Sequence, residues 1–183
     1  MQFKKTQLDG PLLIEPKVFK DPRGFFYETW QKNRYEGVGL PSEFVQDNTS
    51  YSSRGVLRGL HFQQPHAQGK LVTVLLGEIY DVIVDIRVGS PTFGKWEGFQ
   101  LNSDDNVQLW VPTGFAHGFC VTSEKALVIY KVTDVYRPEE EASVIWNDPA
   151  IGVKWPDLEF QLSAKDLKGK PLSEFKKHEL PSL

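Results

Sequence analysis

The stretch from Gly55 to Lys70 gathers side chains that could do chemistry: G-V-L-R-G-L-H-F-Q-Q-P-H-A-Q-G-K. Arg58, His61 and Lys70 stand there among apolar neighbours that are typical of a strand packed into a core. Charged side chains beside apolar walls are costly unless each one has a partner. We therefore expect these residues to line a concave site, whose ligand is anionic at one end and carries a carbonyl at the other.

His61 has two chemical interpretations. A lone histidine on a strand usually satisfies its ring with one backbone hydrogen bond, but a free pKa near about 6.5 also suits a general base at neutral pH. Two neighbours favour the interpretation of His61 as a general base. Arg58 could bind an anionic group, and Lys70 could stabilise a developing oxyanion. A neighbouring carboxylate would fix the ring tautomer and raise its basicity. The sequence offers three such carboxylates without choosing among them: Asp81, Asp85 and Asp166.

Metal binding is the other chemistry that histidines support, and their spacing argues against it. Two ligands on one strand face are two positions apart, whereas His61 and His66 are five apart with Pro65 between them. Cys120 is the only cysteine, which excludes an internal disulfide and a cysteine-cluster site. We therefore expect no metal, with a metal-dependent barrel oxygenase or isomerase as the alternative.

A tyrosine and two arginines are further candidates. Tyr130 lies in the apolar run A-L-V-I-Y-K-V-T, where a core tyrosine and a pocket residue are both possible. Arg23 and Arg58 suit phosphate because guanidinium pairs with two phosphoryl oxygens at once, although Arg23, in a turn, is equally well interpreted as a solvated surface residue. The chain has no glycine-rich phosphate loop, so a phosphate must be held by side chains.

Short apolar runs bounded by turn residues must position these side chains. They predict about ten strands at the roughly 8–12-residue spacing of a sandwich or barrel. We predict an all-β fold, a double-stranded jelly-roll (cupin-like) barrel with short C-terminal helices, in a single domain over residues 1–183. The apolar runs cover 12–14, 18–19, 25–30, 44–52, 56–63, 70–75, 79–86, 94–101, 108–111, 115–119, 126–133 and 142–146, and the helix candidates 31–38, 163–167 and 173–177.

Three local patterns predict finer detail. Residues 79–86 alternate, so Ile79 and Ile83 should face one side of a strand and Val82 the other. The turn L-G-E at 76–78 favours a hairpin between this strand and the run before it. Arg58 and His61 are three positions apart, so on a regular strand their side chains face opposite sides. If both face one ligand, the strand must bulge or twist at Gly59.

Charge and composition exclude several kinds of partner. The formal net charge of −3 provides no basic field for nucleic acid. No apolar run is long enough to span a membrane, and M-Q-F-K-K-T-Q lacks the apolar core of a signal peptide. We expect a soluble cytoplasmic protein with neither nucleic-acid nor membrane partners.

Seven longer motifs span most of the chain. They are D-P-R-G-F-F-Y-E (21–28), V-Q-D-N-T-S-Y-S (45–52), G-V-L-R-G-L-H-F-Q (55–63), G-K-L-V-T-V (69–74), D-V-I-V-D-I-R-V-G-S-P-T-F-G-K-W (81–96), V-P-T-G-F-A-H-G-F (111–119) and Y-K-V-T-D-V-Y (130–136). Any one of them is weak, but together they are specific. On these motifs the chain resembles the dTDP-4-dehydrorhamnose 3,5-epimerase family.

The resemblance implies a cupin-type jelly roll that acts on a dTDP-4-keto-6-deoxy sugar without metal or cofactor. It implies that His61 is the base with Asp166 as its dyad partner, that Tyr130 is the acid, and that Lys70 meets the enolate oxygen. It also implies a homodimer whose N-terminal segment crosses to the partner, so that Arg23 and Glu28 serve the other subunit's pocket. The implied substrate contacts are Arg23, Glu28, Gln46, Asn48, Arg58, His117, Glu141 and Lys165.

The implied reaction inverts C3 and C5 of dTDP-4-dehydro-6-deoxy-D-glucose to give dTDP-4-dehydro-L-rhamnose, in dTDP-L-rhamnose biosynthesis. Hydrogens beside the C4 ketone are acidic, and removing either leaves an enolate whose charge an ammonium can stabilise. Inversion then needs a base and an acid on opposite walls of one pocket. Two alternatives remain: a mono-epimerase acting at C3 or C5 of a related nucleotide 4-keto-6-deoxy sugar, and a non-catalytic sugar-binding jelly roll.

Overall fold

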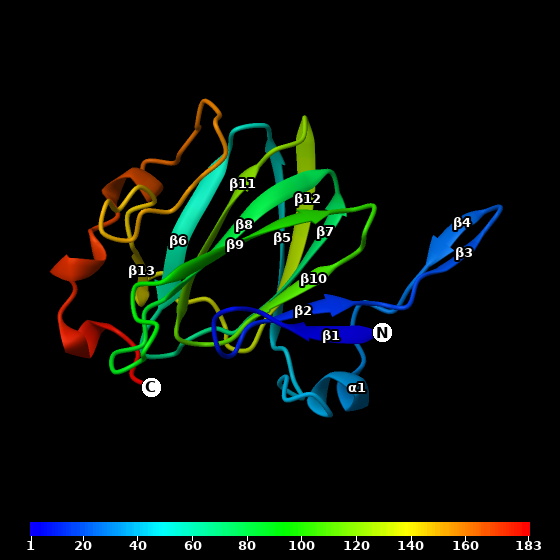
Figure 1. The fold of residues 1–183 in the computed structure, drawn as a ribbon, viewed down its shortest axis with the longest axis horizontal. Coiled ribbons are helices and arrows are strands. Elements are labelled where there is room, and N and C mark those ends of the chain that lie inside the picture. The colour runs from blue at the N-terminus through cyan, green and yellow to red at the C-terminus, as the bar shows by residue number, and fades with distance from the viewer.

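The computed structural model describes residues 1–183 as two antiparallel sheets, with a hairpin that projects from the body (Figure 1). One sheet has six strands and the other five, and together they confirm the predicted all-β jelly roll. The six-stranded sheet runs in the order β1 (Gln2–Lys5), β2 (Leu12–Glu15), β10 (Gln108–Val111), β7 (Lys70–Leu76), β12 (Lys125–Val132), β5 (Gln46–Ser53). The five-stranded sheet runs in the order β13 (Glu141–Ser143), β6 (Leu57–Gln63), β11 (Phe115–Val121), β8 (Glu78–Asp85), β9 (Trp96–Asn102).

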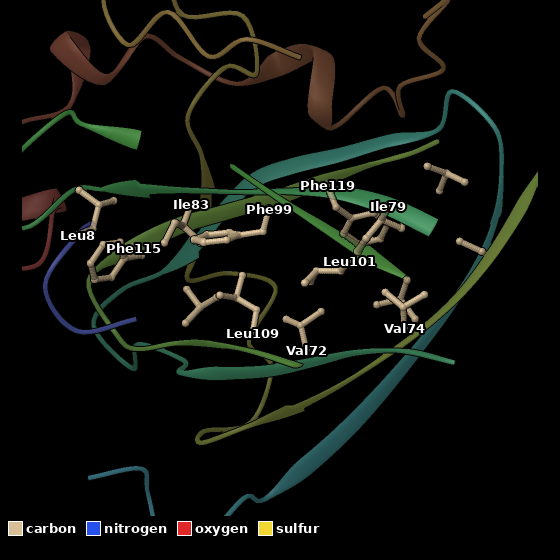
Figure 2. Close-up of a cluster of buried hydrophobic side chains, with 14 residues drawn as sticks. Leu8, Val72, Val74, Ile79, Ile83, Phe99, Leu101, Leu109, Phe115 and Phe119 are labelled. Atoms are coloured by element: carbon tan, nitrogen blue, oxygen red, sulfur yellow. The ribbon is translucent and has the colours of Figure 1, made fainter. Parts of the chain in front are cut away.

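The core between the sheets is built from alternating side chains of both, as Figure 2 shows. Val72 and Val74 of β7 belong to the same buried cluster as Ile79 and Ile83 of β8. The intervening Val82 belongs to a second cluster, in which the outer face of its sheet packs against the C-terminal segment. The alternation predicted for this strand is therefore confirmed.

The predicted hairpin between β7 and β8 is wrong. The two strands are consecutive in sequence but lie in different sheets, since β7 pairs with β10 and β12, and β8 pairs with β9 and β11. Gly77 has a φ of +77°, and a Cβ there would stand 2.0 Å from the carbonyl oxygen of Lys125. The short link L-G-E thus carries the chain across from one sheet to the other, and its sequence is equally compatible with either connection.

β6 is irregular at Gly59, as the parity of Arg58 and His61 predicted. His117 of β11 pairs with His61 and Phe119 pairs with Arg58, so two residues of β6 stand opposite one residue of β11. Gly59 has a φ of +132°, and a Cβ there would lie 2.5 Å from backbone of β11, so only glycine fits. The extra residue turns Arg58 and His61 toward one cavity.

The two ends of the chain follow the predictions only in part. The turn at 21–24 joins β3 (Phe19–Asp21) to β4 (Gly24–Phe26) in the projecting hairpin, but the strand predicted to reach residue 30 ends at Phe26. β1 escaped prediction because Phe3 is its only apolar residue. The helices are α1 (Lys32–Glu36) and three short 3₁₀ turns, η1 (Asp166–Lys168), η2 (Leu172–Glu174) and η3 (Lys177–Glu179). None of them combines the length and apolar character needed to cross a membrane.

Candidate active site

A cavity of about 490 Å³ takes its lining from both sheets and from the loop after β12. This volume lies within the usual range for a small-molecule site. Ten of its fourteen lining residues are not hydrophobic. The lining residues are Asn48, Thr49, Ser50, Tyr51, Arg58, His61, Gln68, Lys70, His117, Gly118, Phe119, Tyr130, Tyr136 and Glu141.

His61 forms a dyad with the buried carboxylate of Asp166. Its Nε2 lies 2.6 Å from Asp166 Oδ1, and the same carboxylate accepts hydrogen bonds from Ser163 Oγ at 2.6 Å and from the Gly59 backbone N–H at 3.2 Å. Burial alone would raise the pKa of Asp166, but these hydrogen bonds outweigh it and hold the pKa at about 2. An ionised carboxylate can only accept, so in the neutral ring Nε2 donates and Nδ1 keeps a free lone pair.

The structure therefore chooses among the three aspartates that the sequence left open. Asp81 binds His117 instead, with both carboxylate oxygens 2.9 Å from Nε2. Asp85 binds Arg87, Ser90 and Thr92 and contacts neither cavity histidine. Only Asp166 stands behind His61, where it can set which ring nitrogen accepts a proton.

Lys70 and Tyr130 come from the sheet opposite His61. Lys70 begins β7 and Tyr130 lies on the neighbouring β12, whereas His61 lies on β6. Burial raises the pKa of Tyr130, so the phenol is protonated at neutral pH and can donate. The cavity thus has an unprotonated imidazole nitrogen on one sheet, and a phenol and an amine on the other.

Burial lowers the pKa of Lys70 to about 8, although Glu141 and Asp81 partly oppose the shift. If the ammonium is the working form, kcat/KM should fall as pH rises above about 8, because kcat/KM reports ionisation of the free enzyme. A pH–rate profile of the wild type and of Lys70→Arg, whose guanidinium stays charged, measures this. A wild-type profile that stays flat to about pH 10 would contradict the assignment.

Arg58 and His117 also line the cavity. Arg58 donates to Ser52 Oγ from Nη2 at 3.0 Å and from Nε at 3.3 Å, which orients a guanidinium that remains exposed. Ser52 itself is buried, and so is His117, which leaves only 6% of its surface exposed. A positioned guanidinium is suited to bind an anionic group.

Glu141 lines the cavity and contacts Tyr136 and Lys165. Tyr136 Oη donates to Glu141 Oε2 at 2.5 Å, and Lys165 Nζ forms an ion pair with the same oxygen. The other oxygen, Oε1, is 3.8 Å from His61 Nδ1. Lys165 therefore reaches the site through Glu141.

Gln46 and Asn48 share the inner face of β5, as strand alternation predicted. Gln46 Nε2 donates to Asn48 Oδ1 at 2.8 Å, and Gln46 Oε1 accepts from the backbone N–H of Tyr136 at 2.9 Å. Asn48 lines the cavity directly. Gln46 instead holds the loop that carries Tyr136.

Arg23 and Glu28 lie outside the cavity of their own chain. Arg23 pairs with Asp21 in the projecting hairpin, with 2.6 Å between Nη2 and Oδ2, and its side chain is 90% exposed. Glu28 lies 3.5 Å from Arg34 at the start of the segment that leads to α1. Neither residue belongs to the set that lines the cavity.

Sequence reasoning missed several lining residues, above all Tyr136. This tyrosine lies in a loop, where periodicity gives no orientation, and only its place in the motif Y-K-V-T-D-V-Y could have indicated it. Ser50 is similar, because it alternates with Asn48 on β5 and could have been inferred from the same face. Its buried hydroxyl oxygen has no hydrogen-bond partner.

Comparison with known proteins gives a consistent result. The family model for dTDP-4-dehydrorhamnose 3,5-epimerase matches residues 5–174. A Shigella flexneri protein of that name is 52% identical over 171 residues, which cover 92% of this chain and 94% of the relative. One from Neisseria gonorrhoeae is 51% identical over 98% of this chain, which spans only 55% of that longer relative. A Legionella pneumophila dTDP-6-deoxy-D-glucose-3,5-epimerase, solved in complex with dTDP-4-keto-L-rhamnose, is 50% identical, with a TM-score of 0.97 and coverage of 100% of this chain and 98% of that one.

Proposed function

The chain belongs to the dTDP-4-dehydrorhamnose 3,5-epimerase family and is a nucleotide-sugar epimerase of dTDP-rhamnose biosynthesis, and from that premise we propose how its residues perform the inversions. The substrate is dTDP-4-dehydro-6-deoxy-D-glucose and the product is dTDP-4-dehydro-L-rhamnose. One observation carries the proposal: His61, whose Nδ1 is free, lies across one cavity from the pair Tyr130 and Lys70.

The first half of each inversion is proton removal. His61 Nδ1 takes the hydrogen from the carbon beside the ketone, and the electron pair of that C–H bond moves to form an enolate with its charge on O4. The Lys70 ammonium stabilises this charge in a partly enclosed site, where a positioned cation is worth more than in water. Asp166 stabilises the imidazolium that forms, because it remains ionised.

The second half is proton delivery to the opposite face. The Tyr130 phenol gives its proton to the same carbon, the enolate collapses to the ketone, and the carbon has inverted. His61 is left as an imidazolium and Tyr130 as a phenolate. Positioned proton transfer of this kind contributes about 10²- to 10⁴-fold, and orientation and the enolate site supply the rest. The same groups serve C3 and C5, because both carbons flank the ketone.

Arg58 is our candidate for the diphosphate contact. Arg58→Ala should weaken dTDP binding about 10- to 100-fold, since a charge-assisted hydrogen bond contributes about 1.5–3 kcal/mol. Isothermal titration with dTDP measures the effect, and Arg54→Ala, outside the cavity lining, is the matched control. Equal affinity in the two variants would remove Arg58 from the nucleotide site.

We further propose a homodimer in which the hairpin of one chain completes the cavity of the other. The hairpin of β3 and β4 projects from the body of the molecule (Figure 1). Its Phe25 and Phe26 are 58% and 70% exposed, an apolar surface that a second copy could cover. Arg23 and Glu28 would then contact the partner's substrate. We also propose that residues 1–183 form a single domain and that the protein is cytoplasmic.

The experiment that tests the function is incubation of the wild type with dTDP-4-dehydro-6-deoxy-D-glucose in D₂O, followed by NMR. We expect deuterium at both C3 and C5 of the product, in the presence and absence of a chelator. Label at one carbon only would indicate a mono-epimerase. Turnover that the chelator abolishes would indicate a metal-dependent enzyme. Binding of the dTDP-sugar without any hydrogen exchange would indicate a non-catalytic sugar-binding jelly roll.

A further inference from the structure

Glu141 is the hydrogen-bond acceptor nearest to the catalytic nitrogen of His61. Glu141 Oε1 lies 3.8 Å from His61 Nδ1, while the other ring nitrogen is engaged by Asp166. The His61 side chain is only 25% exposed even in the open cavity, and a sugar above it would cover it further. Direct contact between Nδ1 and bulk water is therefore restricted during the reaction.

Glu141 is also connected to solvent, through its hydrogen bond with Tyr136. Only 10% of the Glu141 side chain is exposed, whereas Tyr136 is 45% exposed and the Lys165 side chain 51%. The hydrogen bond from Tyr136 to Glu141 is 2.5 Å long. A buried carboxylate thus connects His61 to a hydroxyl group that water can reach.

The double inversion creates a need for such a connection. If the proposed function holds, the first inversion leaves a proton on His61 and a phenolate on Tyr130. The second inversion on the same bound sugar cannot begin until His61 is neutral and Tyr130 is a phenol again. A protonated base that cannot lose its proton would hold the singly inverted sugar on the enzyme or let it escape.

We infer that Glu141 and Tyr136 form a proton relay that returns His61 to its neutral form between the two inversions. The imidazolium gives its Nδ1 proton to Glu141 Oε1, the carboxylic acid turns so that this proton faces the Tyr136 oxygen, and the Tyr136 hydroxyl, which donates to Glu141 at rest, turns to water. Tyr136 then accepts the proton of the acid while it releases its own hydroxyl proton to water, and it turns back to donate to the carboxylate. Glu141 and Tyr136 end as they began. The net change is loss of one proton from His61 to water, and Tyr130 recovers one proton from water.

Two features of the cluster suit this role. Nδ1 and Oε1 must approach from 3.8 Å to the about 2.8 Å of a charge-assisted hydrogen bond, which the attraction between imidazolium and carboxylate favours. Burial raises the pKa of Glu141, but Lys165, Tyr136 and His61 outweigh burial and keep the pKa below its ordinary value. The carboxylate therefore holds a proton only briefly.

The test is the dependence of kcat on buffer concentration. In Glu141→Gln, which keeps the shape of the side chain but cannot carry the proton, kcat in dilute buffer should fall at least about tenfold. High imidazole buffer at the same pH and ionic strength should restore much of the loss, because a small acid–base pair can replace the relay. Tyr136→Phe should respond in the same way. The wild type and Glu140→Gln, a neighbouring glutamate bound to His66 outside the cavity, should be insensitive to buffer.

A role in substrate binding alone would appear differently, as a raised KM with unchanged kcat, or as a lowered kcat that imidazole does not restore. Either result in both variants overturns the relay. If the wild type itself neither exchanges nor inverts the sugar, it is the proposed function that fails. If the wild type inverts both carbons and the variants ignore buffer, only the relay fails.

Discussion

His61→Ala should abolish deuterium exchange at both C3 and C5 while leaving dTDP affinity nearly intact. One imidazole nitrogen is the base for both carbons in this account, and its loss removes at least the about 10²- to 10⁴-fold contribution of positioned proton transfer. dTDP lacks the sugar that His61 would face, and Arg58 remains in place to bind the diphosphate. NMR of substrate in D₂O measures the exchange, and titration with dTDP measures the affinity.

The matched control for this variant is His66→Ala. His66 bonds to Glu140, 2.8 Å away, and lies outside the cavity, so its loss should leave exchange at the wild-type rate. Exchange at the wild-type rate in His61→Ala would show that another group is the base. Loss of exchange in both variants would indicate a general disturbance of β6, which carries His61, and of the loop after it, which carries His66.

Tyr130→Phe should separate exchange from inversion. The variant keeps His61, Asp166 and Lys70, so the enolate still forms and the carbon still exchanges its hydrogen with solvent. Without the phenol on the opposite wall, reprotonation returns to the face of departure, and the substrate is recovered with deuterium but without inversion. The yield of inverted product should fall about 10²-fold or more, in line with the loss of a positioned acid.

Chiral analysis of the recovered sugar by NMR measures this separation. Tyr80→Phe is the control, because Tyr80 packs on the outer face of its sheet against Trp155, away from the cavity. A Tyr130→Phe enzyme that forms the normal product at the normal rate would remove the tyrosine as the acid. A variant with neither exchange nor inversion would assign it a part in enolate formation as well.

The alternation of side chains along β6 shows how much of the site the sequence could predict. Arg58 and His61 should face opposite sides of a regular strand, and the requirement that both contact one ligand predicted the irregularity at Gly59 that the structure contains. Gly59 also gives its backbone N–H to Asp166, so the bulge and the dyad share a residue. That second contact joins segments 107 positions apart, and no local pattern could have predicted it.

The connection between β7 and β8 shows what local sequence patterns cannot predict, which is how strands pair. Two runs of strand residues separated by a glycine turn favour a hairpin, in which both strands lie in one sheet. The buried faces of β7 and β8 must both point into the core between the two sheets. A link that carries the chain from one sheet to the other meets this requirement as well as a hairpin does. The choice depends on pairing with β10, β12, β9 and β11, which are distant in sequence. Tyr136 was missed for the same reason, since its position depends on contacts with Gln46 and Glu141.

The most direct test of the whole account is a crystal structure with a dTDP-4-keto-6-deoxy sugar bound in this cavity. We expect His61 Nδ1 and the Tyr130 hydroxyl on opposite faces of the same sugar ring, each about 3–3.5 Å from a carbon beside the ketone. Lys70 Nζ should lie within hydrogen-bond distance of O4. A sugar with both groups on one face, or with Lys70 turned away from O4, would contradict the mechanism however closely the sequence motifs agree.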